Sequence, residues 1–92
     1  MDGLVRTTVA EVEAAMGSSA TYSAGPASDG MSVQVRWYPS GASIAARTRA
    51  AYALISRLNA AGLWVADTET YWNAQAADLL ADGKPVWIGR IA

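Results

Sequence analysis

The sequence contains no histidine, no cysteine and no phenylalanine, and Lys84 is its only lysine. Histidine is the commonest general base, cysteine provides thiolate nucleophiles, and together they supply most zinc ligands. Their absence argues against many classes of enzyme. The rings that are present, four Trp and four Tyr, each carry a polar group, and such rings are favoured at contact surfaces. The inventory therefore favours a binding protein over an enzyme.

The missing disulfide and zinc ligands matter because the protein is small. Its 92 residues predict a single domain, residues 1–92. A protein of this size buries only about 60–65% of the surface that it exposes when unfolded, so its core is thin. The hydrophobic fraction is 52% and the charged fraction only 16%, against a typical quarter. A thin core and a lightly charged surface favour self-association.

Negatively charged residues are missing from the middle of the sequence. Residues 31–62 carry four arginines and no acid, whereas 1–30 hold one arginine against four acids and 63–92 hold two bases against four acids. These arginines would either pair with acids from the flanking segments or form a patch that faces an anion. The net charge of −1 gives no overall attraction to nucleic acid or to anionic lipid.

Long hydrophobic runs are absent as well, so the sequence pattern predicts no membrane-spanning helix. No apolar run near the start resembles a signal peptide, so we expect a cytoplasmic protein. The 20 alanines indicate a GC-rich genome, such as that of an actinobacterium or one of its phages.

Three segments have the spacing of amphipathic helices. The first helix carries a stripe of Val5, Val9, Val12 and Met16, with Asp2 or Thr8 as its cap, and Gly17 ends it. The longest helix, 44–61, begins after Ser43 and ends at Gly62. Tyr52 lies at one margin of its core stripe and Leu54 at the other, and the stripe itself is Ile44, Thr48, Ala51, Ile55 and Leu58. A shorter helix is predicted over 73–82.

Four segments are predicted as strands. The clearest is 31–38, in which Met31, Val33, Val35 and Trp37 alternate with polar residues. The turn dipeptides Gly25-Pro26 and Asp29-Gly30 favour a hairpin to a short strand before it, and 63–70 and 86–91 are the other two. The sequence thus predicts a small α+β domain in the order α-β-β-α-β-α-β. Its three- or four-stranded sheet carries the long helix on one face, and the strand order stays open.

The second face of this sheet is the main candidate for function. If the apolar strand residues face the long helix, the other face carries Gln34, Arg36, Tyr38, Trp64 and Trp87. Trp, Tyr and Arg dominate protein-binding hot spots. Rings beside an arginine can also stack the bases of single-stranded nucleic acid. In a third interpretation, the N-terminal helix covers this face and the rings belong to the core.

Three other features have simpler explanations than function. Ala46, Ala53 and Ala60 recur at heptad spacing, which would suit a dimer seam or simply solvent-facing alanine. The turn before Ser43, with Arg47 one helical turn on, would hold an anion or merely cap the helix. Four acids would bind magnesium or act as an acid–base pair only if they converge, and their spacing matches no known pattern: Asp67, Glu69, Asp78 and Asp82.

We therefore expect a non-enzymatic interaction or accessory protein that acts through protein–protein contacts, including self-association, and that needs no cofactor and no metal. Its expected binding surface combines the five residues of the second sheet face with three arginines of the long helix: Gln34, Arg36, Tyr38, Trp64 and Trp87, with Arg47, Arg49 and Arg57. The alternative is a single-stranded nucleic-acid-binding protein that uses the same residues.

Overall fold

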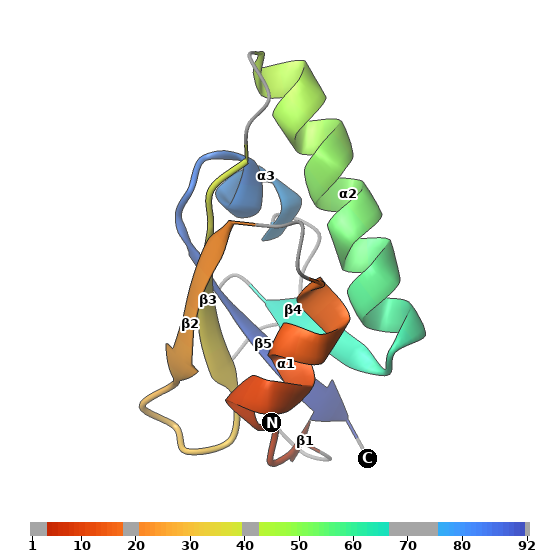
Figure 1. Cartoon of the computed structure of the whole chain (residues 1–92). Helices are drawn as coiled ribbons and strands as arrows, with labels where there is room; N and C mark the ends of the chain where they lie inside the picture. Colours follow the sequence, from red (N-terminus) through yellow and green to blue (C-terminus); the bar gives the residue numbers. More distant parts are fainter. Residues whose placement is uncertain (1–3, 18–20, 40–42, 67–75, 92) are drawn as a thin grey trace.

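The computed structural model describes residues 4–17, 21–39, 43–66 and 76–91. They form helices α1 (Val9–Met16), α2 (Ile44–Ala60) and α3 (Ala76–Ala81), and strands β1 (Leu4–Val5), β2 (Tyr22–Pro26), β3 (Val33–Trp37), β4 (Leu63–Ala66) and β5 (Pro85–Ile91) (Figure 1). The predicted α+β class is confirmed. The main elements follow the predicted order α-β-β-α-β-α-β, and the two-residue strand β1 precedes them.

The sheet is antiparallel and β5 lies in its middle. Ile88 of β5 pairs with Val33 of β3 and with Val65 of β4, so these two strands flank β5 on opposite edges. β2 pairs with the outer edge of β3, which gives the order β2-β3-β5-β4, and β1 continues the β3 side beyond the end of that strand. Since β3 and β4 are both antiparallel to β5, they run parallel to each other, and α2 is the crossover between them.

All three helices pack on one face of this sheet. Their buried residues form a single cluster with the inward side chains of the strands, among them Val35, Val86 and Ile88, which are fully buried. Figure 1 shows α1, α2 and α3 gathered on the same side. We call this side of the sheet the helix face and the opposite side the outer face. Strand alternation therefore assigns every second strand residue to a face that no described helix covers.

The first helix begins later than the apolar stripe predicts. The prediction that Val5 belongs to α1 is wrong, because Val5 pairs with Arg90 in the sheet and is 39% exposed. The backbone N–H of Thr7 donates to the Met31 carbonyl at 2.8 Å, which keeps the backbone extended up to the cap. Thr8 then caps the helix as predicted: its hydroxyl accepts from the Glu11 N–H at 3.2 Å.

The long helix confirms most of the predicted stripe. Ser43 caps it as expected, Ala51 and Leu58 are buried as predicted, and Ile55 packs against the core. Leu54, predicted at the margin of the stripe, is buried as well, whereas Ile44 at its start is 53% exposed. α2 packs against α1, α3 and β4. In Figure 1 the first turn of α2 projects beyond the sheet, away from this packing.

The predicted hairpin joins β2 and β3, and of the two predicted turn dipeptides Asp29-Gly30 lies in its turn, whereas Gly25-Pro26 does not. Both of these residues are in β2, and Pro26 pairs with Val33 at the strand end, where an edge strand tolerates proline. The turn is organised by Asp29, whose carboxylate accepts from the backbone N–H groups of Met31 and Ser32 at 2.8 and 2.9 Å. Burial raises the pKa of this carboxyl, but these hydrogen bonds outweigh it and leave the pKa lowered.

The remaining predicted elements are confirmed where the structure describes them. The predicted strand 63–70 is described as far as Ala66, and the predicted helix 73–82 from Ala76 to Ala81. The rest of these two predictions falls on 67–75, outside the described residues. No helix in the described ranges is long and apolar enough to cross a bilayer.

Candidate functional site

The outer face is built by strand register. Gln34 and Arg36 leave β3 on this side, since their neighbours Val33, Val35 and Trp37 are buried on the helix face. Cross-strand pairing then fixes the neighbours on each side: Gln34 pairs with Gly25 and Trp87, and Arg36 pairs with Ser23 and Pro85. On the far edge, Trp64 and Ala66 of β4 pair with Gly89 and Trp87.

Two large rings are open to solvent on or beside this face. Trp64 is 46% exposed and Tyr38, the residue that follows β3, is 48% exposed. The Tyr38 backbone N–H donates to the Thr21 carbonyl at 2.9 Å, which prolongs the β2–β3 ladder by one residue and fixes where the ring leaves the sheet. Exposed aromatic rings of this size are the type of anchor found at protein-binding hot spots.

Trp87 lies between these two rings and is half-buried. It is flanked across the strands by Gln34 and Ala66, and it is a diagonal neighbour of Trp64 in the β4–β5 ladder, close enough for two large rings to interact. Its indole Nε1 is buried and has no acceptor among the described residues. Ala66, on the same face beside Trp87, is 2% exposed, so the outer face is largely covered here and Trp64 is the ring that is open at the β4 edge.

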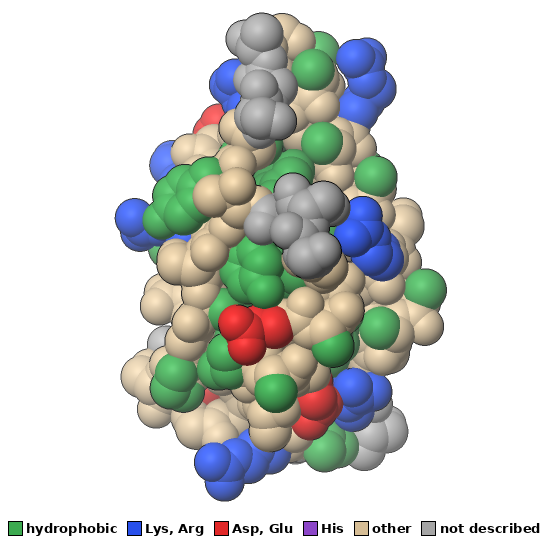
Figure 2. Space-filling model, in the orientation of Figure 1, with side chains coloured by type: hydrophobic (Ala, Val, Ile, Leu, Met, Phe, Trp, Pro, Cys, Tyr) green, Lys and Arg blue, Asp and Glu red, His purple; other side chains and the backbone are tan. Residues whose placement is uncertain are grey.

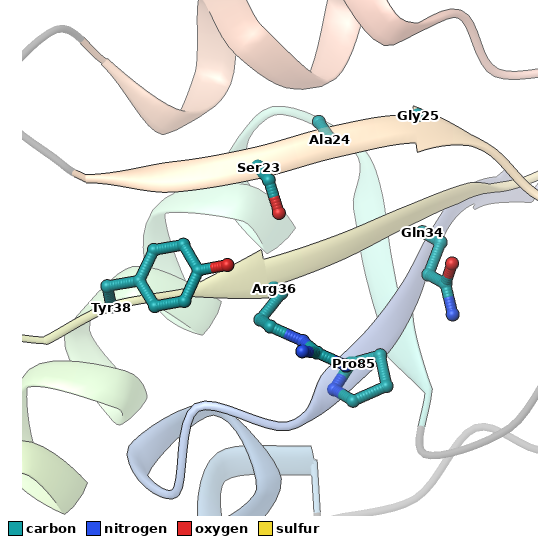
Figure 3. A pocket seen from close by; sticks show the side chains of 7 residues that line it. All are labelled: Ser23, Ala24, Gly25, Gln34, Arg36, Tyr38 and Pro85. Carbon is teal, nitrogen blue, oxygen red and sulfur yellow. The ribbon is translucent and has the colours of Figure 1, made fainter.

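The other end of the outer face is hollowed. An open hollow of about 290 Å³, which we call the Arg36 hollow, is lined by Ser23, Ala24, Gly25, Gln34, Arg36, Tyr38 and Pro85. Figure 3 shows side chains from β2 and β3 projecting into it, beside Pro85 of β5 and the ring of Tyr38. Arg36 is exposed, and it has no hydrogen bond or ion pair with any residue that the structure describes.

The arginines of α2 lie elsewhere. Arg57 Nη1 donates to the Met16 carbonyl at 3.0 Å, and Arg47 Nε donates to the Ala81 carbonyl at 3.1 Å, so both side chains tie α2 to the ends of other helices. Arg49 is exposed on α2, on the helix side of the molecule. In Figure 2, Lys and Arg side chains are scattered around the margins of the visible side and form no single patch.

Arg47 still approaches the predicted surface from its edge. A second, shallower hollow is lined by Tyr38, Pro39, Arg47, Ala81, Asp82 and Gly83, so the Tyr38 ring borders both hollows. Of the eight residues predicted as one binding surface, the structure therefore places Gln34, Arg36, Trp64 and Trp87 on the outer face, with Tyr38 at its border. Arg47 lies beyond that border, and Arg49 and Arg57 are separated from it.

Four residues of the Arg36 hollow were absent from the predicted surface: Ser23, Ala24, Gly25 and Pro85. The alternation of Tyr22 and Ala24 already places Ser23 on the opposite side of its strand. The register that sets Ser23 opposite Arg36 depends on which dipeptide forms the hairpin turn, and the sequence offered both Gly25-Pro26 and Asp29-Gly30.

The acids form no comparable site among the described residues. Asp78 and Asp82 are exposed at α3, and Asp67 and Glu69 lie outside the described ranges. In those ranges no three His, Cys, Asp or Glu side chains come together as potential metal ligands. The alanines of α2 remain on its outer surface, where Ala53 and Ala60 are exposed.

No protein-family model, no curated protein and no solved structure matches this protein.

Proposed function

We propose that this protein is a non-enzymatic interaction module, working in the cytoplasm, and that the outer face of its sheet is the surface that binds a partner protein. One observation carries the proposal. Three helices pack on the helix face, while the opposite face keeps two large rings, Trp64 and Tyr38, about half exposed at 46% and 48%. Tyr38 lines the same hollow as Arg36, Trp64 lies at the opposite edge of the face, and Trp, Tyr and Arg are the residues enriched in protein-binding hot spots.

The size of this face bears on the strength of binding. Four strands about 4.8 Å apart, each about five residues of 3.3 Å, cover roughly 300 Å² in plan. A stable interface buries about 800 Å² on each partner, which is about one sixth of the 5077 Å² surface of this protein. The contact must therefore extend past Tyr38 towards the second hollow, or stay transient.

Self-association is the form of this contact that can be tested with the protein alone. We expect reversible association at micromolar concentrations, weakened by Trp64→Ala. Tyr52→Ala is the matched control, because Tyr52 is 54% exposed but lies on α2, on the other side of the molecule. Sedimentation velocity over a concentration series measures both variants. Equal effects of the two substitutions would remove the outer face from the contact, and a monomer throughout would remove self-association from the proposal.

Single-stranded nucleic acid is the alternative partner for the same rings. The distribution of charge supports protein over nucleic acid, since Arg36 is the one cation that the described strands place on the outer face. Phosphate neutralisation by several cations supplies most non-specific nucleic-acid affinity. Quenching of Trp fluorescence by an oligonucleotide, steeply weakened by salt and lost in Trp64→Ala, would replace our proposal with this alternative.

A further inference from the structure

The Arg36 hollow brings several hydrogen-bond donors together around one positive charge. Ser23 stands directly across from Arg36 on β2, and Gln34 lies two residues before it on the same face of β3. Tyr38 adds a phenolic hydroxyl at one end, and Pro85 forms an apolar wall on the β5 side. A hydroxyl, an amide, a phenol and a guanidinium can all donate hydrogen bonds to one anion.

The charge of the hollow is uncompensated among the described residues. Arg36 is the only charged side chain in its described lining, and no acid is present there. Other arginines of this protein are used differently: Arg90 pairs with the Glu11 carboxylate at 3.0 Å, and Arg57 donates to a backbone carbonyl. A guanidinium presents its donors as a planar fork that matches the two oxygens of a carboxylate.

We propose that the Arg36 hollow binds a carboxylate of the partner protein, either an Asp or Glu side chain or the carboxyl group at its C-terminus. Arg36 holds both carboxylate oxygens, and the hydroxyls of Ser23 and Tyr38 donate to their remaining lone pairs. This inference rests on the proposed function, because it names the chemistry of the partner at the same face. The surface that this module recognises is therefore acidic at one defined point.

A single guanidinium selects for a single negative charge. Phosphate carries up to two charges and is usually bound by clusters of arginines or by several backbone N–H groups. The described lining of the hollow offers one cation. One acidic side chain or one terminal carboxyl group of a partner therefore satisfies the hollow.

The test is a titration of the ¹⁵N-labelled full-length protein with sodium acetate, with sodium chloride at equal ionic strength as reference and methyl phosphate as the competing anion. We expect saturable shifts of the Arg36 Nε–Hε signal and of the Ser23 and Gln34 backbone signals with acetate. Arg36→Lys keeps the charge but loses the fork, and should weaken acetate binding about tenfold. Arg49→Lys, at an exposed arginine of α2, should leave the titration unchanged.

The outcomes separate this inference from the proposed function. Acetate shifts that match those of chloride, shifts as large at Arg49 as at Arg36, or methyl phosphate binding more tightly than acetate would each overturn the carboxylate site. If the acetate site fails while Trp64→Ala still weakens association, only the inference is lost. If acetate binds as expected while Trp64→Ala changes nothing, the hollow is an anion site and the aromatic contact surface is lost.

Discussion

Replacing two side chains of α2 by alanine, one at a time, tests which side of the helix faces the core. Leu54 is 4% exposed, and Leu→Ala at a buried site costs about 3–5 kcal/mol through lost burial and the cavity left behind. Ile44 is 53% exposed, so its truncation removes about 1 kcal/mol of burial. The higher helix propensity of alanine returns about 0.5 kcal/mol of that loss. We therefore expect a loss of about 3 kcal/mol from Leu54→Ala and less than about 1 kcal/mol from Ile44→Ala.

Urea denaturation followed by far-ultraviolet circular dichroism measures both losses. A protein of 92 residues has roughly 5–14 kcal/mol of total stability, so both variants should still fold. At about 4–8 °C per kcal/mol, Leu54→Ala should lower the Tm by about 12–24 °C. A loss at Ile44 equal to or larger than the loss at Leu54 would refute this orientation, because it would mean that the side of α2 carrying Ile44 is buried more deeply than the side carrying Leu54.

Three further predictions follow from polar contacts and backbone geometry. The hydrogen bond from Arg90 lowers the Glu11 pKa below its ordinary 4.5 despite opposing desolvation. The stabilisation that the ionised Glu11 carboxylate contributes is therefore present above pH 4.5 and is lost as the pH falls through the lowered pKa. The free energies of unfolding of wild type and Glu11→Gln should therefore converge below that pKa. Gly62→Ala should cost about 1–2 kcal/mol in urea denaturation, because Gly62 has φ +82 and a Cβ there would lie 2.9 Å from Arg90 Nη1; an unchanged midpoint would contradict this. Arg57→Met should lower the free energy of unfolding by about 1 kcal/mol, because the hydrogen bond to the C-terminus of α1 is lost. Arg49→Met, at an arginine with no such bond described, should change it by less than about 0.5 kcal/mol. Equal losses in the two variants would contradict the capping role of Arg57.

Local signals predicted the elements of this fold well. Thr8 and Ser43 cap their helices as the sequence indicates, and alternation identifies the buried face of β3 residue by residue. The errors arise where long-range pairing decides. Val5 fits a helical stripe, but a two-residue ladder with β5 holds it extended. Ile44 fits the α2 stripe, but it is 53% exposed, while Leu54 at the margin of the stripe is buried where α2 packs against α1, α3 and β4.

The candidate site was predictable in part for the same reason. Strand alternation correctly assigns Gln34 and Arg36 to the face opposite the core, because that assignment depends only on the period of one strand. It does not give the neighbours across the ladder. Ser23 and Pro85 become parts of the Arg36 hollow only through the pairing of β2 and β5 with β3. The pairing register between strands completes the site, and tertiary contacts set that register. Alternation within a single strand carries no information about the register.

The acid-free middle of the sequence has a structural explanation that the residue pattern does not reveal. Arg57 donates to the carbonyl of Met16, the last residue of α1, and Arg47 donates to the carbonyl of Ala81, the last residue of α3. Unpaired carbonyls and the negative end of the helix dipole attract a cation at such a position. Two of the four central arginines therefore stabilise the packing of α2 against its neighbours. Arg36 leaves the sheet on the opposite face, where no described helix end accepts a hydrogen bond from it, and this difference from Arg47 and Arg57 supports the carboxylate site proposed for the Arg36 hollow.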